Sequence, residues 1–162
     1  MTDVTITRLP PAPLHVLEIW SNPAKAAARI KKACGLTLPA MGQSAAKDAL
    51  RLIRYEPTVW LVEGDLQALA GALGDDGSLT AIGGGIVRVE LAGPGWRRLL
   101  MEGGVFDAES PAFAPGCSAA TVIDHVNVRL LVTGEDSCLA FVPASYAADL
   151  IAFWDSAAKA LD

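Results

Sequence analysis

Residues 119–142 read AATVIDHVNVRLLVTGEDSCLAFV, and this stretch decides the fold. It contains three strand-like runs, at residues 119–126, 127–133 and 138–142, which are rich in apolar and β-branched side chains. Parallel strands need a crossover of about a dozen residues or more, and the connections between these runs are much shorter. The stretch therefore predicts neighbouring antiparallel strands.

Similar segments precede and follow this stretch. Strand-like runs lie at residues 14–20, 49–55, 58–63, 79–82 and 86–91. Helices are expected at residues 23–33, 66–73, 96–102 and 145–161, and a loop at residues 36–47. The first helix should begin at Pro23, behind an Asn22 N-cap, and end at Gly35. The last helix is the clearest, because one face carries Ala147, Leu150, Ile151, Trp154, Ala158 and Leu161.

The order of these segments predicts an α+β fold. Two weakly similar strand-helix-strand-strand passes would form antiparallel sheets that helices cover on one side. The chain has 162 residues, which is the size of one typical domain. We therefore expect a single domain over residues 1–162, with possible repeat halves at residues 1–82 and 83–162.

The composition is strongly apolar. Hydrophobic residues make up 52% of the chain and aromatic residues 6%, and the mean hydropathy is +0.36. These values exclude disorder as the main state. No uninterrupted apolar run reaches the about 18 residues that a membrane-spanning helix needs, so no membrane partner is expected. The apolar surplus has to be hidden, and a face buried against a protein partner is one candidate.

The charge is unevenly distributed along the chain. The net charge of −5 argues against nucleic acid as a partner. Basic residues outnumber acidic ones by eight to four up to Trp60, and acidic residues outnumber basic ones by fourteen to five after it. This asymmetry suits electrostatic docking onto another protein, and it is equally compatible with ordinary solvated faces.

Cysteine and histidine give no sign of a metal site. Cys34, Cys117 and Cys138 form no C-x-x-C pair, and their odd number gives no disulfide framework. They are interpreted as reduced thiols of a cytoplasmic protein, and residues 1–8 lack the pattern of a signal peptide. The only histidines, His15 and His125, lie far apart in the sequence, each within a strand-like run.

Three short motifs resemble catalytic or phosphate-binding patterns but lack the necessary context. Gly83–Gly85 leads into a strand-like run instead of a helix. Residues 93–95, Gly-Pro-Gly, lack the Lys and Ser/Thr of a P-loop. Ser118 is near Asp124 and His125, but a nucleophile elbow needs a strand before the serine and a helix after it. No catalytic, cofactor-binding or metal-binding residue is predicted.

The tryptophans are the best material for recognition. Trp20 and Trp96 are candidates for a partner interface, together with Arg97 and Arg98, because buried interfaces are enriched in Trp and Arg. The other interpretation is that these tryptophans belong to the core.

The chain resembles the gamma subunit of heterotetrameric sarcosine oxidase, which is itself similar to the folate-binding domain of the glycine-cleavage aminomethyltransferases. The similarity runs from about Gly35 to the end of the chain. The residues that carry it are Gly35-Leu36-x-Leu38-Pro39, Tyr55-Glu56-Pro57, Trp60-Leu61, Leu91-x-Gly93-Pro94, Leu99-Leu100, Asp107, Phe113-x-Pro115-Gly116-Cys117, Thr121, Val128 and Pro143-x-Ser145-Tyr146-Ala147.

This resemblance implies an aminomethyltransferase-like fold and a non-catalytic subunit. The complex would demethylate sarcosine oxidatively to glycine and transfer the one-carbon unit to tetrahydrofolate. FAD, FMN, NAD and tetrahydrofolate would be bound by the other sarcosine oxidase subunits, which are the expected partners. Two alternatives stay open. One is a stand-alone homodimer that binds a folate-like or small anionic ligand between its repeats, and the other is an independent enzyme.

Overall fold

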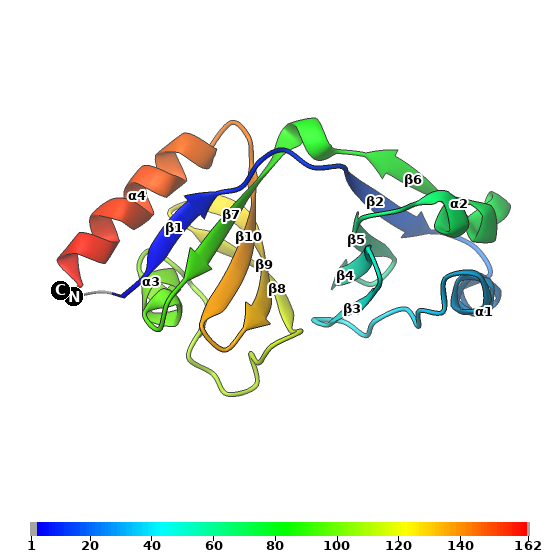
Figure 1. Ribbon diagram of the computed structural model, residues 1–162, viewed down its shortest axis with the longest axis horizontal. Helices are drawn as coiled ribbons and strands as arrows, with labels where there is room; N and C mark the ends of the chain where they lie inside the picture. The colour runs from blue at the N-terminus through cyan, green and yellow to red at the C-terminus, as the bar shows by residue number, and fades with distance from the viewer. Residues whose placement is uncertain (1–2, 162) are drawn as a thin grey trace. The chain divides into compact units, whose positions relative to one another are not determined.

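The computed structural model describes residues 3–161, and the chain divides into two compact units. Unit 1 comprises Met1–Pro11 and Gly84–Asp162, and unit 2 comprises Ala12–Gly83. Each unit contains one five-stranded sheet with antiparallel neighbours, and Figure 1 labels their elements. The predicted α+β fold with antiparallel sheets is therefore confirmed.

The sheet of unit 2 has the strand order β3-β4-β5-β2-β6. Its elements in chain order are β2 (Leu14–Ile19), α1 (Pro23–Cys34), β3 (Ser44–Lys47), β4 (Leu50–Glu56), β5 (Val59–Glu63), α2 (Gln67–Leu73) and β6 (Gly77–Ala81). Alternate strand residues form a core with the two helices. Leu17, Leu52 and Trp60 from the sheet cluster with Ile30 of α1 and Leu69 of α2. Burying each of these side chains contributes about 1.5–3 kcal/mol before the entropy cost of folding.

Helix α1 begins at Pro23 and ends before Gly35 as expected, but the contacts at its N-terminus differ from the prediction. Gly35 ends it in the left-handed region, with φ 64°, and its N–H donates to Lys31 O at 2.9 Å. Asn22 precedes Pro23 as predicted, but its side chain does not cap the helix. Instead its backbone is left-handed, with φ 44°, and Nδ2 donates to Asp76 Oδ1 at 2.8 Å. The predicted N-cap has the right position and the wrong role.

The sheet of unit 1 has the strand order β1-β7-β10-β9-β8. Its elements are β1 (Thr5–Arg8), β7 (Ile86–Ala92), α3 (Trp96–Met101), β8 (Ser118–Ile123), β9 (Val126–Gly134), β10 (Ser137–Pro143) and α4 (Ala147–Ala160). The three strands that the opening stretch predicted are therefore present as β8, β9 and β10. None of the helices that the structure describes is long and apolar enough to span a membrane.

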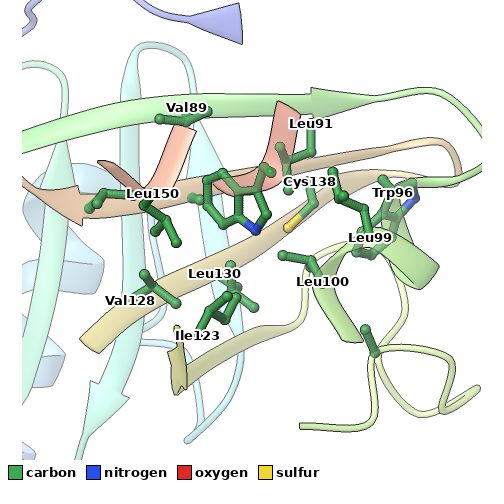
Figure 2. Packing of buried hydrophobic residues seen from close by; sticks show 14 of the residues in the cluster. Val89, Leu91, Trp96, Leu99, Leu100, Ile123, Val128, Leu130, Cys138 and Leu150 are labelled. Atoms are coloured by element: carbon green, nitrogen blue, oxygen red, sulfur yellow. The ribbon is translucent and has the colours of Figure 1, made fainter. Parts of the chain in front are cut away.

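The core of unit 1 lies between its sheet and helices α3 and α4. Figure 2 shows Val128 and Leu130 of β9 on the same side of the sheet as Leu99 of α3 and Leu150 of α4. Trp154, from the predicted apolar face of α4, is fully buried in the same cluster. This burial explains why the last helix has the clearest pattern in the sequence.

Two strands were not expected. The predicted loop at residues 36–47 ends in a strand, because β3 pairs with β4 from Ser44 opposite Ile53 to Lys47 opposite Leu50. Strand β1 was not predicted either. It belongs to the first eleven residues but pairs with β7, so the N-terminal segment contributes an edge strand to unit 1.

Candidate functional site

The glycine-rich motifs have structural roles. Gly83–Gly85 forms one 3₁₀ turn that leads directly into β7, without a helix N-terminus that could face a phosphate. Gly93 has φ 117°, and a Cβ there would lie 1.8 Å from Asp3 O. Its N–H donates to Asp136 O at 2.8 Å. Only glycine fits this close backbone approach, so the motif around residue 93 is explained by packing.

The structure does not bring Ser118 together with Asp124 and His125. Ser118 is buried at the first position of β8, whereas Asp124 and His125 form the exposed turn after its last residue. Six residues of extended strand span about 20 Å. The serine is therefore too far from the turn for a nucleophile–base contact, which needs about 3 Å.

The thiols and histidines form no reactive cluster. Burial raises the pKa of the Cys138 thiol to about 12, and burial followed by the charge of Asp65 raises the pKa of Cys34. Both thiols are therefore protonated near neutral pH and are poor nucleophiles. His15 is partly buried in unit 2, and His125 is exposed in unit 1. Within residues 3–161, no group of three His, Cys, Asp or Glu side chains could hold a metal ion.

Trp20 is exposed and held in a fixed orientation. Its side chain is 59% exposed, and Nε1 donates to Asp75 O at 3.2 Å. The next residue, Asp76, accepts hydrogen bonds from Ser21 Oγ at 2.6 Å and from Arg29 at 2.6 Å. We call residues 20–22 and 75–76, with Arg29, the Trp20 corner. An exposed, ordered indole is the kind of side chain that anchors protein interfaces.

Trp96 and Arg97 are used inside unit 1. Trp96 is 0% exposed, and its Nε1 donates to Glu135 O at 3.0 Å. The Arg97 guanidinium lies 4.2 Å from the Trp96 ring centroid and donates to Ala108 O at 2.6 Å and Phe113 O at 2.9 Å. The buried indole offers no surface to a partner, and Arg97 fixes the loop that follows α3.

Trp20 and Arg98 are the predicted interface residues that remain accessible. Arg98 is exposed on α3 in unit 1, whereas Trp20 belongs to unit 2. Met101 and Val105, whose side chains are 42% and 82% exposed, were not predicted from the sequence. In the sequence Met101 follows Leu99-Leu100 and Val105 precedes Phe106, so no sequence signal separates these two exposed side chains from their more buried neighbours.

Two solved structures have similar folds. One is a chain of heterotetrameric sarcosine oxidase from Corynebacterium sp. U-96 in complex with pyrrole 2-carboxylate, with a TM-score of 0.85, 22% identity and coverage of 96% of this chain and 84% of that chain. The other is glycine cleavage system aminomethyltransferase T from Bartonella henselae, with a TM-score of 0.63 and 17% identity. In that case the match covers 92% of this chain but only 45% of the aminomethyltransferase. These matches confirm the predicted aminomethyltransferase-like fold.

The family is identified by the sequence itself. No curated protein matches the chain. The model of the sarcosine oxidase gamma subunit family, however, matches residues 20–160, which is most of the chain and includes both units. This confirms the resemblance inferred from the short motifs: the chain belongs to the sarcosine oxidase gamma subunit family.

Proposed function

We propose that the chain is a non-catalytic subunit of a heterotetrameric, flavin-dependent sarcosine oxidase. The observation that carries the proposal is the family match over residues 20–160. The complex oxidises the N-methyl group of sarcosine by two electrons, which pass to a flavin. The methyl carbon is then transferred to tetrahydrofolate, and glycine is released. Flavin as FAD and FMN, NAD and tetrahydrofolate are assigned to the partner subunits.

The roles of the motif residues support a non-catalytic subunit. Gly83–Gly85 and Gly93 serve turns and close packing, and Ser118 lies a strand length from His125. The Cys138 thiol is protonated near neutral pH because burial raises its pKa. Each group is accounted for by folding, so the chemistry is assigned to other chains. A cytoplasmic location fits the three free thiols.

Trp20 and Arg98 are proposed as contacts with the partner subunits. Both side chains are exposed, and Trp20 is already ordered by its bond to Asp75. An ordered aromatic side chain loses little conformational entropy on binding. Trp96 and Arg97 are not proposed as partner contacts, because their side chains bind groups within unit 1.

Co-expression with the flavin-bearing subunits of a sarcosine oxidase from the same organism tests the proposal. The chain should co-purify with them at a fixed stoichiometry, and the isolated chain should not oxidise sarcosine. Failure of the chain to join the complex would overturn the proposal. If the chain alone were a homodimer whose melting temperature rises with tetrahydrofolate, the stand-alone binding protein would replace it.

A further inference from the structure

Two apolar side chains protrude from unit 1 at the end of α3. Val105 is 82% exposed, and Met101, four residues earlier, is 42% exposed. We call these two residues the apolar knob. It begins the long loop at residues 102–117, which joins α3 to β8 (Figure 1). A single exposed valine costs little free energy and is common on protein surfaces. Whether Val105 can serve as a binding surface therefore depends on whether the loop holds it in place.

The backbone on both sides of Val105 is fixed. Gly103 has φ 65°, and a Cβ there would lie 2.7 Å from Phe153 Cζ, so this residue is packed tightly. Its carbonyl oxygen accepts the N–H of Asp124 at 3.0 Å. On the other side, the Phe106 ring meets the Phe113 ring edge-on at 4.8 Å. The Arg97 guanidinium in turn donates a hydrogen bond to Phe113 O.

A knob with a fixed backbone is preorganised for binding. Because the loop is already ordered, a partner that covers Val105 does not have to immobilise it. The turn between Met101 and Gly104 is closed by the Gly104 N–H, which donates to Met101 O at 3.3 Å, so the chain leaves α3 in a defined direction just before Val105. The exposed apolar surface is therefore a stable property of the fold.

The surroundings of the knob are acidic. Four exposed acidic residues belong to this region: Glu102, Asp107 and Glu109 lie within four residues of Val105 in the sequence, and Asp124 is joined to Gly103 through its N–H. Arg98 is the nearest exposed cation in the sequence. None of these four takes part in an ion pair within residues 3–161. The whole of unit 1 has eleven acidic residues against six basic ones, whereas unit 2 has seven of each.

We propose that the apolar knob docks into an apolar pocket with a Lys/Arg-rich rim on another subunit of the complex. This inference rests on the proposed function and adds the docking surface. An apolar centre with a charged rim is the usual anatomy of a specific interface. The carboxylates steer a basic rim toward the knob, and a second copy of unit 1 is disfavoured because its own rim is acidic.

Val105→Asp tests the knob in the reconstituted complex. The affinity of the isolated chain for the other subunits should fall at least about tenfold, because a carboxylate cannot be buried in an apolar pocket without a large cost. The melting temperature of the isolated variant should not change, because Val105 is 82% exposed. The matched control is Met41→Asp in unit 2, where Met41 is 50% exposed; its affinity should stay at the wild-type value.

Charge reversal tests the rim independently. Glu102→Lys combined with Glu109→Lys should slow association about tenfold at low salt, and the difference from wild type should shrink at high salt. If the wild-type chain joins the complex and Val105→Asp binds as tightly as wild type, or no more weakly than Met41→Asp, the docking surface is wrong. If the wild-type chain does not join the complex at all, the proposed function is wrong instead.

Discussion

Arg97 ties helix α3 to the loop that follows it. Its guanidinium donates to Ala108 O and Phe113 O and stacks on Trp96. Arg97→Ala leaves two carbonyl groups without their donor, so we expect a loss of about 2–3 kcal/mol in the free energy of unfolding. Urea denaturation followed by circular dichroism measures this loss.

The neighbouring arginine provides the control. Arg98 is exposed, so Arg98→Ala should change the free energy of unfolding by less than about 0.5 kcal/mol. Equal effects of the two substitutions would show that Arg97 does not fix the loop. Arg97→Lys should also destabilise the fold, because an ammonium cannot reproduce two donors in the plane of a guanidinium.

Asp76 makes the Trp20 corner sensitive to acid. Hydrogen bonds from Ser21, Asn22 and Arg29 hold the pKa of the Asp76 carboxyl well below its ordinary value. A lowered pKa in the folded state stabilises the fold above the unfolded pKa of about 4, and this stabilisation is lost as pH falls toward the folded value. Asp76→Asn should therefore reduce stability at pH 7.

The pH dependence separates this effect from simple packing. The difference in unfolding free energy between wild type and Asp76→Asn should narrow as pH falls below about 4, because the carboxyl of the unfolded wild-type chain then takes up a proton that the folded state, with its lowered pKa, does not bind. Guanidinium denaturation at pH 7 and pH 3 measures both proteins. A difference that does not depend on pH would contradict the role assigned to the ionised carboxylate.

At the residue scale, the backbone role of Gly35 was predictable from the sequence, whereas the side-chain roles of Asn22 and Trp96 were not. Gly35 ends α1 as expected, because a left-handed terminator depends on the local chain alone. Asn22 and Trp96 could not be assigned in the same way. Asn22 binds Asp76 and Trp96 binds Glu135 O, and both partners are distant in the sequence. Contacts of this kind arise only from tertiary structure.

At the element scale, the β8–β9 turn is a testable weak point. Asp124 and His125 have φ values of 45° and 65°, so both central residues of this hairpin are left-handed. Hairpin turns of this type favour glycine, because a side chain with positive φ is strained. We expect His125→Gly to raise the free energy of unfolding by about 0.5–1 kcal/mol.

Thermal unfolding of the purified chain measures this gain. His125→Ala is the matched control, since it removes the imidazole but keeps a Cβ in the strained conformation, and it should not stabilise the protein. If His125→Ala stabilises the protein as much as His125→Gly does, the gain comes from removing the imidazole and not from relieving backbone strain. Because His125 is exposed, neither substitution opens a cavity.

The elements that the sequence missed are short edge strands. Strand β3 reads SAAK and has little intrinsic preference for extended structure, so its conformation comes from pairing with β4. Strand β1 has four residues, and its partner β7 begins almost eighty residues later. The central strands were predictable, because their apolar runs are determined by burial against the helices.

At the scale of the whole molecule, the uneven distribution of acidic and basic residues follows the two structural units and not the two halves of the sequence. Along the chain, the basic excess ends at about Trp60, which lies in the middle of unit 2. Counted by unit, unit 2 is balanced and unit 1 carries the acidic excess. The sequence indicated that a charged surface could serve docking, but locating it required the boundary between the units at Gly83 and Gly84. The N-terminal segment, which the pairing of β1 with β7 places in unit 1, contributes one Asp and one Arg and leaves this balance unchanged.

The pairing of β1 with β7 predicts that residues 1–162 unfold as a single domain. Strand β1 can pair with β7 only when the ends of Ala12–Gly83 are close together. Closing an unfolded loop of that length costs about 4 kcal/mol. Folded unit 2 brings its ends together, because Ile82 N–H donates to Leu14 O at 2.9 Å. Folding of unit 2 therefore favours completion of the sheet in unit 1.

A cavity in unit 2 tests this coupling. Ile30 is fully buried in α1, and Ile30→Ala should cost about 2–5 kcal/mol. Calorimetry should show one transition, lowered by about 5–15 °C. Hydrogen exchange of the β1 amides, Thr5–Arg8, should accelerate in the same variant although none of these residues contacts the cavity cluster. Two separate transitions, or unchanged exchange in β1, would mean that the units unfold independently, because the loop-closure coupling would then be too weak to join them.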